Sequence, residues 1–458
     1  MTTESHMDSF GANLHGELLR PHDAQYDAAR RVYNAMIDRH PRAIARCADI
    51  ADVINAVRFA GEHDLTLAVR GGGHNGAGFG VCDDGLVIDL ARLKGIRVDP
   101  IGRTVRVEGG CTWGDVDHVT HAFGMATPSG VVSTTGVGGL TLGGGIGHLT
   151  RRYGLSIDNL LEADIVLADG RLITCNAERD ADLFWAIRGG GGNFGVVTSF
   201  LFRLHAVDTV IAGPTLWPIE KAPEVMGWYR EFILSAPEAL NGFFVFLIVP
   251  PGAPFPEHLH LKNLCGVFWC HSGPAEEAVP IFDKIKELGP PLLHSVQPMP
   301  FPALQSAFDA LYPPGMQWYW RADFVNEISD DAIALHTRYG SEIPSLRSTM
   351  HLYPIDGAAH RIGRNETAFS YRDANWAEVI IGIDPDPAET DRIIGWTKAY
   401  WDALHPHSAG GAYVNFLMDE GQDRIRSTYR DNYERLVAVK RAFDAANLFR
   451  VNQNIRPA

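Results

Sequence analysis

The sequence lacks the patterns that mark several common classes of protein. Its 458 residues include six cysteines, which form no C-x-x-C pair and have no accompanying histidine spacing, so neither a zinc site nor a disulfide framework is expected. No apolar stretch approaches the ~20 residues that span a bilayer, and the first residues lack the basic region and apolar run of a signal peptide. We therefore expect reduced core thiols, no metal, no membrane partner and a cytoplasmic location.

Basic residues are fewer than acidic residues. The chain carries 40 basic against 55 acidic residues, a formal net charge of −15, which argues against nucleic acid or an anionic membrane as partner. The hydrophobic share of 46% and the charged share of 21% are ordinary for a globular chain. Single cores stop growing near roughly 250–300 residues, so this length predicts two domains. A small-molecule substrate fits these properties best, and they leave the oligomeric state open.

The N-terminal half alternates short β-rich runs with turn signals. Ile96–Val98 and Thr104–Val107 flank one such signal, and Ile165–Leu167 and Leu172–Thr174 flank another, so each pair predicts a β-hairpin. Helical periodicity over Ile50–Glu62 is interspersed with these runs. Together the patterns predict an α+β fold with an antiparallel or mixed sheet rather than strict βαβ winding.

The second half predicts a sheet covered by helices. Phe243–Val249 and Val379–Ile383 are apolar runs typical of strands, whereas 275–288 and 388–404 carry apolar residues at helical spacing. Near the C-terminus, a single helix is expected over residues 425–440, with Lys440 near its end, where the helix dipole favours a cation.

Glycine is concentrated in three clusters. Glycine lets backbone N–H groups converge without obstruction by Cβ atoms, and such nests bind phosphates. Two of the clusters match G-x-G-x-x-G, at 71–76 and 190–195, but neither opens a helix as a nicotinamide-binding Rossmann unit requires. An NAD-dependent Rossmann oxidoreductase and a non-catalytic ligand-binding protein remain as alternatives. The clusters span residues 71–80, 136–147 and 189–195.

A histidine, His74, stands inside the first of these clusters. Its glycine neighbours leave room for the imidazole to approach a cofactor ring closely. A neutral imidazole is nucleophilic enough to add to the activated methyl carbon of a flavin. The local pattern therefore favours a flavin held through His74, and the alternative is a tight turn without a ligand.

Several longer motifs point in the same direction. On these motifs the chain resembles the berberine bridge enzyme-like FAD-linked oxidases of the vanillyl-alcohol oxidase superfamily, from about residue 40 to the end. They are RGGGHN at 70–75, PSG at 128–130, GVGGLTLGGGIG at 136–147, RYGLSIDN at 152–159, LFWAIRGGGGNFG at 183–195, YVNF at 413–416 and FRVNQNI at 449–455.

The resemblance implies a fold and a division of the chain. It implies a two-part FAD-binding domain of the PCMH type over residues 1–207, with a core of about 38–207. A substrate domain with a mostly antiparallel sheet covered by helices would occupy 208–410. The segment 411–458 would return to the FAD domain.

The resemblance also implies a covalent bond between His74 and the 8α methyl of FAD, and a set of cofactor contacts. The Arg70–Asn75 loop would hold the pyrophosphate, and the later residues would run beside the flavin ring and diphosphate. The implied cofactor residues are Arg70, Gly71, Gly72, Gly73, His74, Asn75, Ser133, Thr134, Thr135, Gly136, Gly138, Gly139, Leu140, Gly144, Gly145, Asn159, Val197, Asn452 and Asn454.

The chain departs from the family pattern at four positions. Val132 stands where some members carry a second flavin-linking cysteine, so a single link is expected, as in bacterial members with one bond. Phe416 stands where members that oxidise alcohols or phenols often have a tyrosine base. Gly76 replaces a frequent aromatic residue, and Ile380 replaces a frequent Gln or Glu.

Strand alternation offers one replacement for the missing polar group. Glu378 shares a face with Ile380, so Glu378 is the candidate catalytic residue, and a solvated carboxylate at a strand end is its alternative. The remaining candidates for the substrate pocket are Tyr319, Arg321, His351, Tyr371 and Phe416.

These inferences predict an FAD-dependent oxidase. It would take hydride from a C–H next to O or N of a small organic molecule, and O2 would reoxidise the flavin. A dehydrogenase that uses another acceptor is the alternative. Without a tyrosine at Phe416, we expect either an amine-like substrate that needs no strong base or catalysis by another residue such as Glu378. Because the family's substrates range over sugars, alkaloids, alcohols and phenols, the substrate itself is not predicted.

Overall fold

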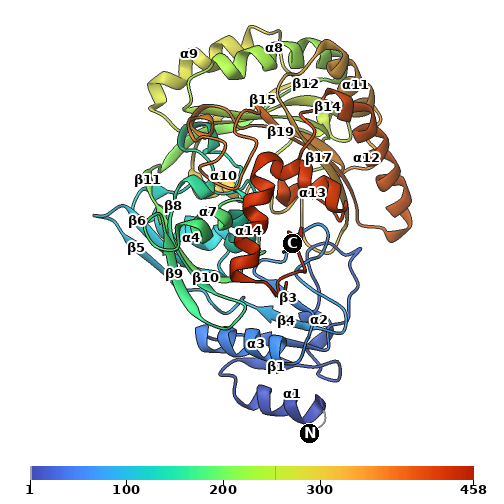
Figure 1. The fold of residues 1–458 in the computed structure, drawn as a ribbon. Coiled ribbons are helices and arrows are strands. Elements are labelled where there is room, and N and C mark those ends of the chain that lie inside the picture. The colour runs from blue at the N-terminus through green and yellow to red at the C-terminus, as the bar shows by residue number, and fades with distance from the viewer. Residues whose placement is uncertain (1–2, 253, 458) are drawn as a thin grey trace.

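The computed structural model describes residues 3–252 and 254–457 and contains three main sheets (Figure 1). The first sheet has the order β1-β2-β4-β3, in which β2, β4 and β3 run parallel and β1 is antiparallel to β2. Helix α3 connects β2 to β3, and Asp49 caps its N-terminus by accepting a hydrogen bond from the Asp52 N–H with its side chain. The elements here are α1 (Thr3–Ala12), β1 (Glu17–Leu19), α2 (Tyr26–Ala29), β2 (Ala43–Arg46), α3 (Ile50–Glu62), β3 (Leu67–Arg70) and β4 (Leu86–Asp89).

The second sheet is antiparallel, with the order β5-β6-β10-β8-β9. Both predicted hairpins are confirmed, because β5 pairs with β6 and β8 pairs with β9. Its elements and the helices near them are β5 (Ile96–Asp99), β6 (Thr104–Glu108), α4 (Trp113–His121), β7 (Met125–Ala126), α5 (Val137–Gly143), α6 (Thr150–Tyr153), β8 (Leu160–Val166), β9 (Leu172–Asn176), α7 (Ala181–Ile187), β10 (Val196–Arg203) and β11 (His205–Ala206).

The third sheet is the largest and is antiparallel throughout, with the order β15-β12-β14-β13-β18-β19-β17 and β16 paired to β12. Its strands are β12 (Thr209–Pro218), β13 (Leu240–Ile248), β14 (Asn263–His271), β15 (Leu293–His294), β16 (Gln297–Pro300), β17 (Gln317–Val325), β18 (Thr349–Pro354) and β19 (Trp376–Asp384).

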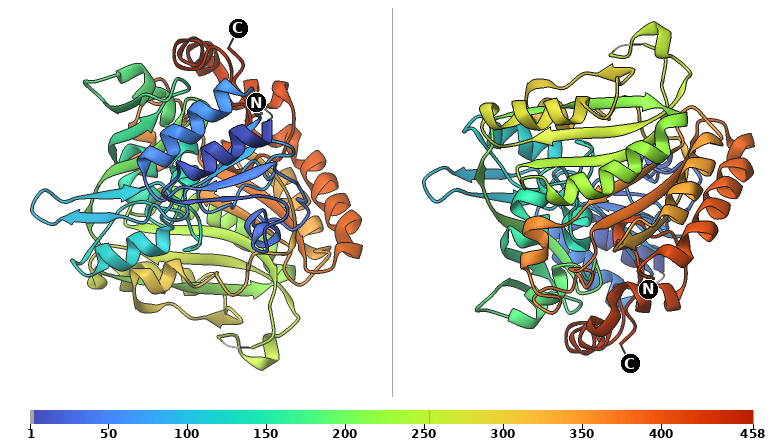
Figure 2. Two further views of the ribbon diagram at one scale, coloured as in Figure 1. Left: turned by 90° about the horizontal axis from the view of Figure 1, so that it is seen from below. Right: turned by 90° about the horizontal axis from the view of Figure 1, so that it is seen from above.

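Helices cover one face of this third sheet, as predicted (Figure 2). Alternate residues of the strands, such as Phe244, Met350 and Ile380, pack under these helices in one hydrophobic cluster. The opposite face belongs to a second cluster that it shares with the N-terminal half of the chain. The covering helices are α8 (Ala222–Ser235), α9 (Ala275–Lys286), α11 (Asp330–Ser341) and α12 (Thr390–Leu404), and α10 (Phe301–Gln305) lies beside α4.

The C-terminal segment contains two helices where one was predicted. The prediction over residues 425–440 is wrong because the chain breaks at Arg430, whose φ is 44°, between α13 (Gln422–Tyr429) and α14 (Tyr433–Phe443). The Arg430 guanidinium lies 3.4 Å from the ring centroid of Tyr371 and pairs with Asp373 at 2.7 Å. These contacts hold the break in place.

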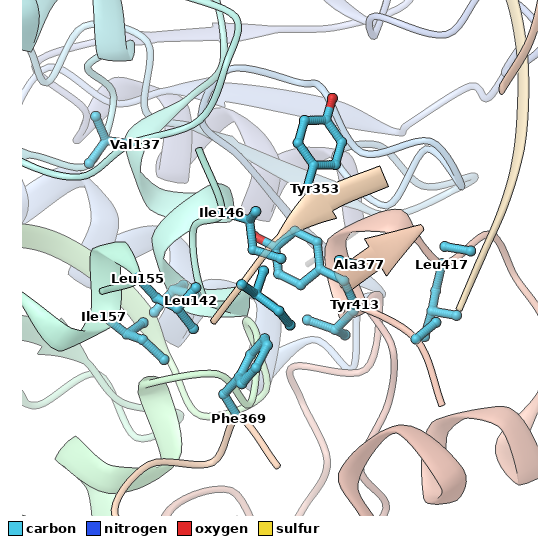
Figure 3. Packing of buried hydrophobic residues seen from close by; sticks show 14 of the residues in the cluster. Val137, Leu142, Ile146, Leu155, Ile157, Tyr353, Phe369, Ala377, Tyr413 and Leu417 are labelled. Atoms are coloured by element: carbon cyan, nitrogen blue, oxygen red, sulfur yellow. The ribbon is translucent and has the colours of Figure 1, made fainter. Parts of the chain in front are cut away.

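The large hydrophobic cluster joins distant parts of the chain. Figure 3 shows Leu142 and Ile146, which lie within the second glycine cluster, packed beside Phe369 and Tyr413. All six cysteines are buried and unpaired. Of the helices in residues 3–252 and 254–457, none has both the length and the apolar character needed to cross a membrane.

Candidate functional site

A cavity of about 350 Å³ lies between the glycine clusters, the third sheet and the C-terminal segment. All three glycine clusters contribute backbone to its wall. Thirteen of the predicted cofactor residues line it: Arg70, Gly71, Gly72, Gly73, His74, Asn75, Thr135, Gly136, Gly138, Gly139, Leu140, Val197 and Asn452.

The first two glycine clusters meet backbone to backbone. A Cβ atom on Gly72 would lie 2.4 Å from the Gly136 nitrogen, and one on Gly136 would lie 2.3 Å from the Gly72 nitrogen. Only glycine permits this approach. Within the described chain, the backbone N–H groups of residues 71–75 donate to no protein acceptor. They therefore form the free, glycine-built nest that suits a diphosphate.

Arg70 holds this loop in position. Its guanidinium pairs with Asp89 at 2.7 Å and donates to the Arg31 carbonyl at 3.2 Å. The aliphatic part of the side chain packs against Gly73, whose φ is +72°. Because Arg70 is buried and already paired, its main effect is to fix the course of the loop rather than to add a free charge to the cavity.

His74 is held in a defined position at the wall of the cavity. Its ring stacks on Tyr33 with centroids 4.0 Å apart, and its Nε2 shares a hydrogen bond of 3.1 Å with the Thr134 hydroxyl. The ring is exposed to the cavity interior, and burial by the surrounding protein lowers the pKa of His74 to about 4. The imidazole is therefore neutral at physiological pH, and Thr134 is its polar partner among the described residues.

Tyr33 was not predicted as a site residue, although it is central to this arrangement. Its backbone N–H donates to the Gly73 carbonyl, and its hydroxyl donates to the Tyr312 carbonyl. Tyr33 thus connects the His74 loop to the chain that leads into β17.

The C-terminal segment closes the cavity beside the third glycine cluster. The Asn452 side-chain amide donates to the Gly192 backbone carbonyl at 3.1 Å. The Asn193 side-chain amide donates to the Gln453 backbone carbonyl, also at 3.1 Å. In the parts of the chain that the structure describes, the buried side-chain oxygens of Asn452 and Asn454 have no hydrogen-bond partner. Buried acceptors are normally paired. Asn452 lines the cavity, so its oxygen fits a bound group that carries N–H or O–H donors, as FAD does, whereas Asn454 is not among the lining residues.

Five further cofactor candidates serve the scaffold around the cavity. Ser133 donates to Asp309, and Gly145 donates from its N–H to the Tyr413 hydroxyl. Asn159 lies away from the cavity and donates its amide to the Leu155 and Tyr153 carbonyls. The remaining two do not line the cavity either: Thr134 and Gly144.

The third sheet supplies the other wall. Trp318 and Trp320 face the cavity from β17, and His351 and Tyr353 face it from β18. His351 was predicted, and so was Phe416, which also lines the cavity. The wall is completed by Val131, Val132, Phe243, Phe308, Tyr312, Val379, Ile381, Tyr413, Val414 and Asn415.

The prediction that Tyr319 and Arg321 line the pocket is wrong. They alternate with Trp318 and Trp320 along β17 and therefore lie on the helix-covered face. There Arg321 pairs with Glu420, and its guanidinium lies 5.3 Å from the ring centroid of Trp401.

Tyr371 is also outside the cavity. Its hydroxyl donates to the Ser427 carbonyl at 3.0 Å, and its ring stacks on Phe324 with centroids 4.4 Å apart. It is a satisfied core tyrosine.

The prediction of Glu378 as the catalytic residue is contradicted by its position. Glu378 and Ile380 do share a face, but it is the face under the helices, whereas Val379 and Ile381 line the cavity. Burial, together with the charge of the directly opposite Asp323, raises the pKa of Glu378 well above its ordinary value. Its carboxyl is therefore a buried acid outside the reaction space.

Gly76 has a specific partner. A Cβ atom at this position would lie 2.2 Å from Cζ2 of Trp320, so the indole fills the space beside the His74 loop. The aromatic group that is absent at position 76 is thus supplied from β17, 244 residues further along the chain.

The described residues that line the cavity include no cysteine. Val132 lines the cavity, whereas Cys111 is buried on another segment with its thiol near the Leu93 carbonyl. The Rossmann alternative is excluded by the fold, because β4 and β10, rather than helices, are the next regular elements after residues 71–76 and 190–195.

Two family models match the chain at the segments that build this site. A model described as FAD binding domain covers residues 41–176, and one described as Berberine and berberine like covers 412–456. Together with the free N–H nest and the unpaired side-chain oxygen of Asn452, these matches define an FAD-dependent flavoprotein.

Relatives that match nearly the whole chain assign the protein to a narrower family. An FAD-linked oxidoreductase of Dictyostelium discoideum is 31% identical over 455 residues, which are 98% of this chain and 97% of that protein. The (R)-6-hydroxynicotine oxidase of Paenarthrobacter nicotinovorans is 28% identical over 471 residues and is covered to 97%. The chain belongs to the berberine bridge enzyme-like FAD-linked oxidoreductases.

Solved structures share the whole fold. The structure of 6-hydroxy-D-nicotine oxidase from Arthrobacter nicotinovorans superposes with a TM-score of 0.87 at 25% identity, covering 97% of this chain and 99% of that one. A berberine bridge enzyme-like protein of Physcomitrella patens gives 0.88 at 22% identity, with 99% of each chain covered. The predicted fold class is confirmed.

Proposed function

We propose that this FAD-linked oxidoreductase holds its flavin covalently through His74 and uses O2 as electron acceptor. The observation that carries the proposal is the state of His74: it is neutral, stacked on Tyr33 and hydrogen-bonded to Thr134, beside a free backbone nest. A neutral ring nitrogen aimed by its neighbours is the nucleophile that a covalent flavin bond requires.

The residues divide the work of holding the cofactor. The N–H groups of 71–75 suit the diphosphate, and Asn452 offers an unpaired acceptor in the cavity wall from the C-terminal side. Bound FAD supplies the acceptor for a hydride and the reactivity toward O2.

The overall reaction balances as a two-electron oxidation. The substrate loses a hydride from a carbon next to O or N, and it loses the O–H or N–H proton. The product is the corresponding carbonyl or imine, and O2 becomes hydrogen peroxide. The relatives 6-hydroxynicotine oxidase and xylooligosaccharide oxidase are named as oxidases, which supports this choice of acceptor.

Acid precipitation tests the covalent bond. The yellow chromophore of the wild-type protein should stay with the precipitate, whereas the His74→Ala protein should release any flavin it binds into the supernatant. His351→Ala, which changes a second histidine of the same cavity, should keep its chromophore in the precipitate. Retention of the bond in His74→Ala would refute the assignment.

The acceptor is tested separately. In a screen of small alcohols, phenols and amines, an oxidase produces one hydrogen peroxide per substrate oxidised under air. If turnover requires an added dye or quinone and yields no peroxide, the protein is a dehydrogenase.

A further inference from the structure

The wall that faces the glycine clusters is almost without charge. Of the described residues that line the cavity, Arg70 is the only ionised one, and Asp89 already neutralises it. No Asp, Glu or Lys is among them. The ring-bearing residues Trp318, Trp320 and Tyr312 instead dominate the β17 side, with the two indoles in a T-shaped contact at 6.1 Å.

One polar pair stands in this aromatic wall. His351 Nδ1 and the Tyr353 hydroxyl share a hydrogen bond of 2.7 Å, two residues apart on β18 and therefore on the same face. The ring centroid of Phe243 lies 5.0 Å from those of His351 and Tyr353, and the ring centroid of Phe416 lies 5.9 Å from that of Tyr353. Apolar rings thus surround the pair on the protein side.

Two other tyrosine hydroxyls of the cavity, those of Tyr413 and Tyr33, already have protein partners. The Tyr413 oxygen accepts from the Gly145 N–H at 2.8 Å and from the Asn415 amide at 2.7 Å, so both of its acceptor positions are used. The Tyr33 hydroxyl donates to a carbonyl. His351 and Tyr353 are therefore the groups best able to accept a hydrogen bond from a ligand.

The titratable groups that face this pair do not bring charge to it. Tyr312 and Tyr413 are near, and burial raises the pKa of each to about 12. On the neighbouring strands β13 and β19, the residues paired with His351 are Val245 and Val379. Burial lowers the pKa of His351 to about 3 and raises that of Tyr353. Both groups are neutral over the physiological range, so an ionised ligand beside them would have no counter-charge.

We propose that the cavity binds an uncharged ring compound with one hydroxyl or amino group, which the His351–Tyr353 pair holds by hydrogen bonds, and that it rejects the ionised form of the same compound. The neutral pair supplies both a donor and an acceptor, because the imidazole can carry its proton on either nitrogen. The indoles and Tyr312 supply faces on which a ring can stack. This deepens the proposed function, since it names the substrate class of the same site.

A binding experiment on the flavin-loaded protein tests the inference without turnover. Equilibrium dialysis measures the affinity for 4-nitrophenol, which becomes an anion as pH rises, and for 4-nitrotoluene, which stays neutral. Above the pKa of the free phenol, the affinity for 4-nitrophenol should fall about tenfold for each pH unit, while that for 4-nitrotoluene stays constant. An affinity for 4-nitrophenol that is constant or rises on ionisation would overturn the proposal, and so would an absence of saturable binding of either probe.

Two variants locate the polar anchor. Tyr353→Phe keeps the ring and removes the hydroxyl, so it should weaken 4-nitrophenol about three- to tenfold and leave 4-nitrotoluene unchanged. Tyr319→Phe makes the same change on the opposite face of the sheet and should leave both affinities unchanged. Equal weakening by the two variants, or none by Tyr353→Phe, would remove the pair from this role.

The wild-type pH comparison remains decisive if Tyr353→Phe does not fold. The outcome is also independent of the covalent bond and of the electron acceptor. A protein that releases its flavin in acid can still show the selectivity for neutral ligands, and a protein with a covalent flavin can fail to show it.

Discussion

The buried ion pair of Lys440 and Asp444 offers a quantitative test of how the C-terminal segment is held against the cavity. The Lys440 side chain is fully buried, and its ammonium donates to Asp444 at 2.6 Å, to the Asn193 carbonyl at 2.7 Å and to the Phe449 carbonyl at 2.9 Å. One charged group thus joins α14, the third glycine cluster and the segment that leads to Asn452.

Lys440→Met keeps most of the side-chain volume and removes the charge. The Asp444 carboxylate stays buried with only the N–H groups of Leu448 and Phe449 to satisfy it. Removal of one partner of a buried pair costs about 3–5 kcal/mol. At roughly 2–4 °C per kcal/mol for a unit of 150–250 residues, Tm should fall by about 6–20 °C. Circular dichroism and flavin fluorescence would follow the melting at constant pH, and both signals should shift.

Two controls make this measurement specific. Lys286→Met removes an exposed partner of Asp283 and should change the stability by less than about 1 kcal/mol. Adding Asp444→Asn to Lys440→Met should recover part of the loss, because the uncompensated charge is removed as well. If the two lysine variants melt within 1–2 °C of each other, roughly the cost of a surface pair, the role assigned to Lys440 is refuted.

Two further predictions concern the sheet that forms the substrate wall. Gly76→Ala would place a Cβ atom 2.2 Å from Trp320 and should destabilise the protein by about 1–3 kcal/mol; in thermal melts, the same change made on a Trp320→Ala background should cost much less. Because burial raises the pKa of Glu378, the folded protein keeps a proton there that the unfolded chain loses. Wild-type stability should thus be full at acidic pH and fall as pH rises toward the raised pKa. Glu378→Gln should flatten this fall in Tm between about pH 5 and about pH 9. The pH profile of turnover should stay unchanged. If the variant instead loses the alkaline limb of the wild-type activity profile, Glu378 would again be a candidate base.

The glycine loops could be predicted from the sequence because their chemistry is local. A glycine-built loop needs only consecutive residues without side chains, and both the stretch around His74 and the stretch after Gly136 reach the cavity wall. The contact between His74 and Tyr33 could not be found in this way. The two residues are 41 positions apart in the sequence, and their stacking depends on a backbone bond from Tyr33 to Gly73 that only the folded chain brings together.

The C-terminal helix shows a second kind of error. Apolar spacing from Ile425 to Leu436 continues through Arg430 with nearly helical periodicity, so the pattern conceals the break. Lys440 does lie in the last turn of α14, as expected, but it is also a fully buried cation paired with Asp444, which was not predicted. A charged residue in a regular amphipathic pattern does not reveal its own burial, because burial is decided by partners such as Asn193 from elsewhere in the chain.

The prediction of catalytic and pocket residues on β17 and β19 failed because it chose the wrong face of the third sheet. Both faces of the third sheet are buried, one under helices and one over the cavity, so hydrophobic alternation cannot tell them apart. The polar candidates Arg321 and Glu378 drew attention to the helix-covered face, where Arg321 pairs with Glu420. The cavity face carries indoles, phenyl rings and one neutral histidine–tyrosine pair instead. In a site where the flavin supplies the redox chemistry, the wall opposite it needs to exclude charge and orient a ring, and aromatic residues on alternate positions of β17 and β18 are the signal of that task.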